Sequence, residues 1–131
     1  MSRWKTSITA VYNLSYHLIW CPKYRRPVLT SGVEVRLLEL LHQKAVSLGV
    51  EIVEANILPD HVHLFVRSKP IHSPQFIIGQ LKGYTSNILR QEFPKLKSRL
   101  PTLWTRSYYI DSVGRLNEHT IRRYVCEQKN K

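Results

Sequence analysis

The stretch EIVEANILPDHVHLFVR (residues 51–67) contains the pattern that decides the fold. Two runs of strand-forming residues, 51–58 and 61–67, flank Pro59-Asp60, a dipeptide typical of tight turns. A turn this short joins only antiparallel neighbours, so the two runs are expected to pair with each other. The centre of the chain is therefore predicted to be a β-hairpin.

Before this hairpin, the sequence predicts one strand and one helix. Apolar and polar residues alternate cleanly over Tyr12–Cys21, as in a half-buried strand. A helix is expected from about Val33 to Gly49, with Ser31 and Glu34 spaced as a capping box. The expected buried stripe of this helix consists of Leu37, Leu38, Leu41, Ala45 and Leu48.

After the hairpin, the pattern predicts a second helix, a fourth strand and a last helix. The second helix is expected over 74–92, with Ser73 as its N-cap and Pro94 as its stop. Residues 103–113 are rich in Trp, Thr, Tyr and Ile, which favours a strand, and a last helix is expected over 118–128. The core-facing residues expected on the second helix are Ile77, Leu81, Tyr84, Ile88 and Leu89.

The first six of these elements follow the order β-α-β-β-α-β. This order predicts an α+β fold of the ferredoxin-like kind, an antiparallel sheet with two helices on one face. The length of 131 residues suits one domain, residues 1–131, with an additional C-terminal helix. The other face of the sheet is left open for a ligand, a partner or the last helix.

The composition favours a nucleic-acid partner. The net charge is +11, and 43% of the residues are hydrophobic, which is enough for an ordinary core. Basic residues occur in three stretches without any acidic residue, 1–33, 61–91 and 93–110. Such stretches attract a polyanion by releasing its counterions, although a merely basic protein would have the same charge.

Other classes of protein fit the sequence poorly. The N-terminus has no apolar segment of the kind found in signal peptides, and no apolar run approaches the length of a membrane helix. Cys21 and Cys126 lie far apart and form no Cys-x-x-Cys pair. We therefore expect a cytoplasmic protein with no membrane partner.

The third strand contains a candidate metal site, His61-Val62-His63. Because side chains alternate along a strand, both imidazoles are expected on one face, close enough to share a divalent metal ion. Two nitrogen ligands require further oxygen ligands. Taken alone, the spacing fits two surface histidines equally well.

The last helix offers the missing groups. Tyr124 and Gln128 are four residues apart and share a helix face with Ile121 and Val125. If this apolar face docks on the open sheet, the Gln128 amide oxygen becomes a third ligand and the Tyr124 hydroxyl lies beside the metal. A phenolate favoured by the cation could then attack a phosphodiester, although Tyr124 could also be an ordinary packed aromatic residue.

Five segments in this order resemble the TnpA transposases of the insertion-sequence 200/605 family, the single-tyrosine members of the HUH endonucleases. The segments are YHLIWCPKYRRPVL, ILPDHVHLFV, LKGYTSNILRQEFP, LWTRSYYIDSVG and IRRYVCEQ. The resemblance implies that His61, His63 and Gln128 hold Mg²⁺ or Mn²⁺ and that Tyr124 is the nucleophile. It implies a single-stranded DNA substrate with hairpins at the transposon ends, and a 5′-phosphotyrosine intermediate. It also implies a homodimer in which the tyrosine helix of one protomer can complete the histidine pair of the other, and it implies no small-molecule substrate.

Two groups of residues are candidates for DNA contact. The first combines positive charge with an aromatic ring, as single-strand binders do, and the second lies on one face of the second helix. The two groups are Lys23, Tyr24, Arg25 and Arg26, and Lys82 and Arg90. His17, on the polar face of the first strand, is interpreted as a structural histidine, with a position toward the metal site as the alternative.

Three other functions fit the sequence less well than that of a transposase. A nickase of the rolling-circle or relaxase kind would use the same chemistry but resembles larger chains. A single-stranded-DNA- or RNA-binding module without catalysis would share the fold, but the RNP1 pattern breaks at Thr85. A histidine-triad hydrolase needs a third alternating histidine where Phe65 stands.

Overall fold

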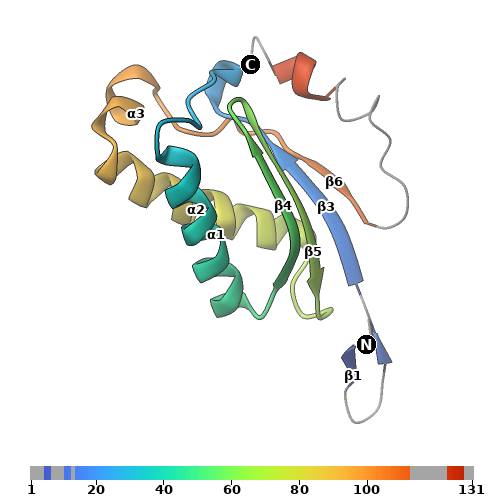
Figure 1. Cartoon of the computed structure of the whole chain (residues 1–131). Coiled ribbons are helices and arrows are strands. Elements are labelled where there is room, and N and C mark those ends of the chain that lie inside the picture. Colours follow the sequence, from blue (N-terminus) through green and yellow to red (C-terminus); the bar gives the residue numbers. More distant parts are fainter. Residues whose placement is uncertain (1–4, 7–10, 13, 113–123, 129–131) are drawn as a thin grey trace.

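The computed structural model describes residues 5–6, 11–12, 14–112 and 124–128 (Figure 1). A short hairpin, β1 and β2, precedes the main sheet, whose first strand is followed by a single 3-10 turn, η1. The elements in chain order are β1 (Lys5–Thr6), β2 (Val11–Tyr12), β3 (Leu14–Trp20), η1 (Lys23–Arg25), α1 (Val33–Leu48), β4 (Glu51–Leu58), β5 (His61–Ser68), α2 (Pro74–Glu92), α3 (Pro94–Arg99) and β6 (Tyr109–Asp111). Among the helices described, none is long and apolar enough to cross a lipid bilayer.

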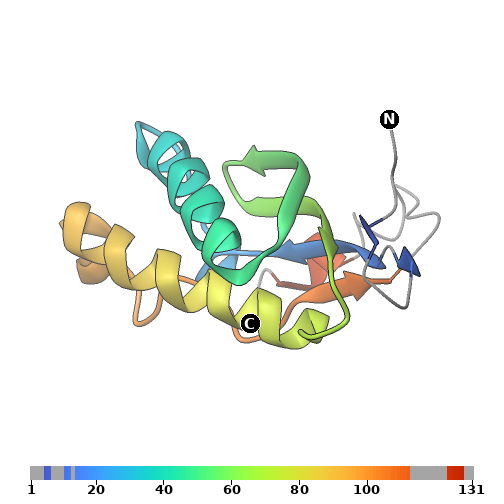
Figure 2. The same cartoon turned by 90° about the horizontal axis from the view of Figure 1, so that it is seen from below.

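The main sheet has four strands in the order β4-β5-β3-β6, and every neighbouring pair is antiparallel. The two views in Figures 1 and 2 show α1 and α2 packed against one face of this sheet. The predicted ferredoxin-like α+β fold is thus confirmed. Strand β5 lies in the interior of the sheet, between β4 and β3, so the predicted hairpin is the centre of the fold.

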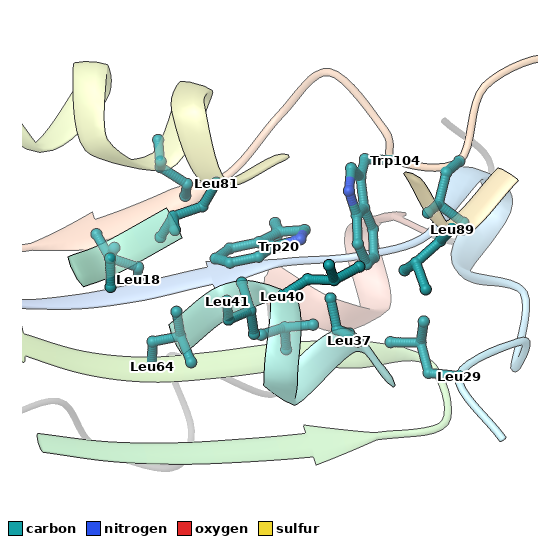
Figure 3. Packing of buried hydrophobic residues seen from close by; sticks show 14 of the residues in the cluster. Leu18, Trp20, Leu29, Leu37, Leu40, Leu41, Leu64, Leu81, Leu89 and Trp104 are labelled. Carbon is teal, nitrogen blue, oxygen red and sulfur yellow. The ribbon is translucent and has the colours of Figure 1, made fainter. Parts of the chain in front are cut away.

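The core fills the space between the sheet and the two helices (Figure 3). In β5, alternate residues from Val62 to Ser68 are buried, while those from His61 to Arg67 are only half-buried. Trp20 of β3 and Trp104 pack edge to face, with their ring centroids 5.8 Å apart. The alternation read from the sequence is therefore the division between core face and open face.

Helix α1 begins differently from the expected capping box. Gly32, not Ser31, is the N-cap, with φ of 98°, and the structure shows no side-chain cap hydrogen bond there. The Glu34 carboxylate instead accepts a hydrogen bond from the Gly32 amide at 2.9 Å, so Glu34 contacts the helix start without the expected Ser31 exchange. At the other end, Gly49 adopts φ of 71° and closes the helix as predicted.

The buried stripe of α1 is displaced from the predicted one. Leu38 is 38% exposed, whereas Leu40, which the prediction left out, is fully buried. Both residues flank the line through Leu37 and Leu41, one on each side. Helical periodicity cannot choose between the two sides, because the choice depends on where α2 and the sheet lie.

Helix α2 matches its predicted bounds and its predicted cap. The Ser73 hydroxyl accepts a hydrogen bond from the Phe76 amide at 3.0 Å. Tyr84 and Ile88, which were predicted to face the core, are partly buried against it. After the helix ends, Pro94 begins the short helix α3, which the sequence analysis did not predict.

The fourth strand is shorter than the predicted 103–113. Only Tyr109–Asp111 pair with β3, and an isolated bridge joins Trp104 to Pro22. Between these two pairings, the carbonyl groups of residues 105–107 accept hydrogen bonds from the Lys82 ammonium, at 2.7, 3.4 and 3.3 Å. The half-buried Lys82 ammonium thus holds the carbonyl groups of the chain where the ladder is interrupted. Val113 lies outside the described residues, as does most of the predicted last helix, of which residues 124–127 are helical.

The corrected stripe of α1 predicts different costs for two neighbouring leucines. Leu40→Ala should lower the free energy of unfolding by about 2–5 kcal/mol, because it leaves a cavity in a closed core. Leu38→Ala should cost roughly 0.5–1 kcal/mol, since that side chain is already partly solvated. Urea unfolding followed by circular dichroism measures both, and equal losses would contradict the observed placement of α1.

Candidate functional site

The open face of the sheet carries the two histidines of the candidate metal site. His61 and His63 occupy alternate half-buried positions of β5, on the face opposite the helices. Across the sheet, His63 is paired with Asn56 of β4 and with Ile19 of β3. The prediction that the two imidazoles share a face is confirmed, while their role as metal ligands stays a prediction.

The ring of His61 is held by the residue before it. His61 Nδ1 lies 2.9 Å from the Oδ1 atom of Asp60, in the turn between β4 and β5. The second carboxylate oxygen, Oδ2, lies 3.3 Å from Nε of Arg25. A carboxylate on one ring nitrogen fixes the orientation of an imidazole and leaves Nε2 as the nitrogen for a ligand bond.

His63 has a different partner, His17 of β3. The Nδ1 atom of His17 lies 3.1 Å from Nε2 of His63, and the His17 ring also packs on Phe65 at 4.8 Å between centroids. Burial, with added repulsion from His17 and His61, lowers the pKa of His63. His63 is therefore neutral near pH 7, the form in which an imidazole can bind a metal. His17 is therefore hydrogen-bonded, and it also lies toward the candidate metal site, the position that the sequence analysis gave as the alternative.

The described part of the last helix, residues 124–128, contacts both β6 and η1. The ring of Tyr124 packs on Tyr109 of β6, with centroids 6.2 Å apart. The main-chain carbonyl of Val125 accepts a hydrogen bond from Nη1 of Arg25 at 3.3 Å. In Figure 1 this segment, in red, lies at the same end of the sheet as η1. Within one chain, the tyrosine-bearing segment thus contacts β6 and Arg25 of η1. Its predicted docking beside the histidine pair stays a prediction.

Ser107, which no sequence pattern indicated, contacts both predicted site residues of this segment. The Ser107 hydroxyl donates a hydrogen bond to Oε1 of Gln128 and lies 3.5 Å from the Tyr124 hydroxyl. Gln128 is buried, and Tyr124 is half-buried. No local pattern marks Ser107, because its position depends on the departure of residues 105–107 from the strand ladder.

The environment of Tyr124 keeps its hydroxyl protonated. Burial raises the pKa of Tyr124 well above its ordinary value, and the hydrogen bond with Ser107 offsets this only in part. A phenol in this state is a weak nucleophile. Attack by this oxygen therefore requires a nearby positive charge or a base that takes the proton.

The side chains present fit a divalent metal ion. The free Nε2 of His61 and the neutral ring of His63 are suitable nitrogen donors, and the Gln128 amide is a suitable oxygen donor. Gln128 Oε1 is held by Ser107 in this structure, and His63 Nε2 by His17. Over the described ranges, no group of three His, Cys, Asp or Glu side chains is arranged around a common point.

The predicted DNA contacts divide into exposed and internal side chains. Tyr24 and Arg26 are exposed, and the Lys23 ammonium lies 5.2 Å from the centre of the Tyr24 ring. The Arg25 guanidinium instead binds Asp60 and Val125, as described above. The two candidates on α2, Lys82 and Arg90, donate to main-chain carbonyls of the same chain. A contact of any of these residues with DNA stays a prediction.

Burial lowers the pKa of Lys82 to about 8. Its ammonium also lies 5.5 Å from the centre of the Tyr108 ring. Through its hydrogen bonds to the carbonyl groups of residues 105–107, Lys82 holds the segment that contains Ser107. This internal function competes with the predicted contact to a phosphate.

The family model described as "Transposase IS200 like" matches residues 10–128 of this chain. The ISDra2 transposase TnpA of Deinococcus radiodurans is 36% identical over 123 residues, which cover 92% of this chain and 88% of that protein. The transposase for insertion sequence element IS200 of Salmonella typhimurium is 33% identical over 119 residues, covering 89% and 78% of the two chains.

Solved structures agree with these relatives. A crystal structure of a Deinococcus radiodurans protein described as a transposase has a TM-score of 0.84 and 35% identity, over 95% of this chain and 97% of that one. The REP-associated tyrosine transposase bound to a REP hairpin has a TM-score of 0.58 over 92% of this chain and 68% of that one. At 14% identity, the second likeness shows the shared fold alone.

The fold of this chain agrees with that of these relatives. The family match spans nearly the whole chain, and both curated relatives are covered over more than three quarters of their length. The chain therefore belongs to the IS200-like family of transposases, enzymes that cleave and rejoin DNA.

Proposed function

We propose that this transposase cleaves and rejoins single-stranded DNA through a covalent intermediate on Tyr124, with Mg²⁺ or Mn²⁺ held by His61, His63 and Gln128. One observation carries the proposal. The segment that contains Tyr124 is connected to the histidine strand through Arg25 and Asp60, so nucleophile and predicted ligands belong to one continuous set of contacts.

The reaction follows from the chemistry of a phenol and a phosphodiester. The Tyr124 oxygen attacks phosphorus while the bond from phosphorus to the 3′ oxygen breaks, and the proton lost by the phenol is balanced by the proton gained by the leaving 3′ oxygen. The products are a 5′-phosphotyrosine and a free 3′-OH. Attack of a different 3′-OH on the phosphotyrosine reverses these bonds and rejoins DNA without an external energy source.

The divalent cation would polarise the phosphate and favour the phenolate over the phenol. The raised pKa of Tyr124 supports this dependence, because the buried hydroxyl stays protonated without a positive charge beside it. The lowered pKa of His63 supports a role as a neutral ligand at physiological pH. Asp60 orients His61 for the same purpose.

Single-stranded DNA with hairpins is the substrate that suits the surface. An exposed tyrosine among basic residues, Tyr24 beside Lys23 and Arg26, is the combination that stacks on unpaired bases and follows phosphates. A hairpin is the ligand of the REP-associated transposase that shares the fold. We extend this preference to the ends of the element that this transposase moves.

A homodimer is part of the proposal. Among the described strands, β4 and β6 lie at the edges of the main sheet, where a second copy could add a strand. In such a dimer the tyrosine segment of one protomer would form the active site together with the histidines of its partner, instead of those of its own chain. The contacts of residues 124–128 within one chain describe the alternative arrangement.

Removal of the nucleophile should abolish the covalent intermediate. Tyr124→Phe is expected to fold and to bind single-stranded DNA, because the lost hydroxyl makes only a long contact with Ser107. Its rate of adduct formation should fall below about one-thousandth of the wild-type rate. Denaturing gels of oligonucleotides from the DNA that flanks the gene, with Mg²⁺ or Mn²⁺, measure this. An adduct of wild-type yield in the variant would place the nucleophile elsewhere.

Loss of a metal ligand should abolish cleavage but not DNA binding. His61→Ala and His63→Ala are expected to lose metal-dependent cleavage, and EDTA should suppress cleavage by the wild type. Because the two rings lie on the half-buried face, neither substitution opens the core. Cleavage assays with a titration of Mn²⁺ test this, with His42→Ala, on exposed surface of α1, as the matched control. Undiminished cleavage in EDTA would exclude the metal.

The proposed assembly predicts a defined mass in solution. Light scattering at micromolar concentration should give about twice the mass of one chain. A mass of one chain, without DNA and with it, would exclude the dimer and would leave only a site formed within a single chain.

A further inference from the structure

We infer that Asp60 and Arg25 are a positioning pair, which sets the tyrosine-bearing segment against the histidine strand. This inference rests on the proposed function and deepens it. It gives Arg25 an internal role in place of the predicted contact with DNA, and it gives Asp60 a role beyond that of a turn residue.

The carboxylate of Asp60 has two separate partners. Its Oδ1 atom lies 2.9 Å from His61 Nδ1, and its Oδ2 atom lies 3.3 Å from Arg25 Nε. The side chains of Arg25 and His61 are 18% and 15% exposed, so water competes little for these contacts. One carboxylate thus ties the ligand ring to the guanidinium.

The guanidinium of Arg25 continues the connection to the tyrosine segment. Its Nη1 donates to the main-chain carbonyl of Val125, the residue that follows Tyr124. Residues 25, 60 and 125 lie far apart in the sequence and belong to three different segments. The planar guanidinium can donate from Nε and Nη1 at once, which the single ammonium of a lysine could not do in this geometry.

The backbone of η1 supports an internal role for Arg25. Tyr24 and Arg25 have φ of 58° and 50°, in the left-handed region that is unfavourable for residues with a side chain. Such strain persists where surrounding contacts hold it. Here the Arg25 amide donates to the Pro22 carbonyl at 2.8 Å, and the Arg25 side chain adds the contacts with Asp60 and Val125. The neighbouring side chains of Tyr24 and Arg26 face solvent.

Two functional consequences follow. Asp60 fixes the ring of His61, so its loss should weaken metal binding. Arg25 fixes the main chain beside Tyr124, so its loss should slow attack by the phenol while DNA binding is kept. A DNA contact at Arg25 would have the opposite signature, namely weaker binding and a smaller salt dependence at an unchanged rate.

The experiment compares Arg25→Gln and Asp60→Asn with Arg36→Gln. Arg36 pairs with Glu92 at 2.8 Å on the far side of the helices, so its loss removes the same charge and a similar ion pair away from the site. Arg26→Gln serves as the reference for a true loss of DNA contact. Full-length proteins are measured for single-stranded DNA affinity against salt, single-turnover adduct formation at saturating DNA, Mn²⁺ affinity by calorimetry, and amide hydrogen exchange of residues 124–128.

With Arg25→Gln, we expect the rate of adduct formation at saturating DNA to fall roughly 10–100-fold. Amide hydrogen exchange at residues 126–128 should become faster, because the segment loses a contact that holds it. The affinity for DNA should stay within about twofold of the wild-type value. With Asp60→Asn, Mn²⁺ affinity should fall roughly 10–100-fold. The double variant should be slowed by less than the product of the two single effects, because both substitutions break one connection. Arg36→Gln should change none of these quantities.

The inference would be overturned if Arg25→Gln bound DNA more weakly and with a smaller salt dependence, while its rate of adduct formation and its amide hydrogen exchange matched those of the wild type. Unchanged Mn²⁺ affinity in Asp60→Asn would overturn its first half. Failure of the proposed function is recognised separately, because the wild type would then form no adduct. Hydrogen exchange and Mn²⁺ affinity would still decide whether the pair connects the two segments.

Discussion

The structure depends on the two-sided character of β5. This strand lies inside the sheet, and its side chains point alternately to the helices and to the open face. Val62, Leu64 and Val66 are fully buried in the core, so a shift of the strand by one residue would place them on the open face and the histidines in the core. The register that builds the core therefore also presents His61 and His63 together. Fold and site are specified by the same alternation.

A second feature shapes the other side of the site. Trp104 donates from its indole nitrogen to the carbonyl of Lys82 and to the Thr85 hydroxyl, and Lys82 holds the carbonyl groups of residues 105–107. The chain bulges between Thr105, whose amide still donates to the Cys21 carbonyl at 3.0 Å, and the start of β6. The bulge carries Ser107 to Gln128 and Tyr124. The interruption of the fourth strand is thus what brings a hydroxyl to the tyrosine segment.

Positive charge has two uses in this chain that the sequence does not separate. Exposed residues such as Arg26 add to the field that attracts a polyanion. Arg25, Lys82 and Arg90 instead donate to carboxylate or carbonyl oxygens within the chain. All six residues predicted to contact DNA occur in stretches without acids, so the local pattern does not distinguish the two uses. Internal hydrogen bonding distinguishes them only after the chain has folded.

The sequence by itself determined the order of elements, the hairpin at 51–67, the shared face of His61 and His63, and the family, because these depend on local periodicity and on motifs in a fixed order. It also predicted both ends of α2 and the glycine that ends α1. Tertiary structure alone decided that Leu40 and not Leu38 is buried, that residues 105–107 leave the strand, and that Ser107, Asp60 and Arg25 surround the site. These outcomes depend on contacts between residues distant in the chain. Local pattern cannot specify them, because the partner of each of these side chains depends on where another element of the fold lies.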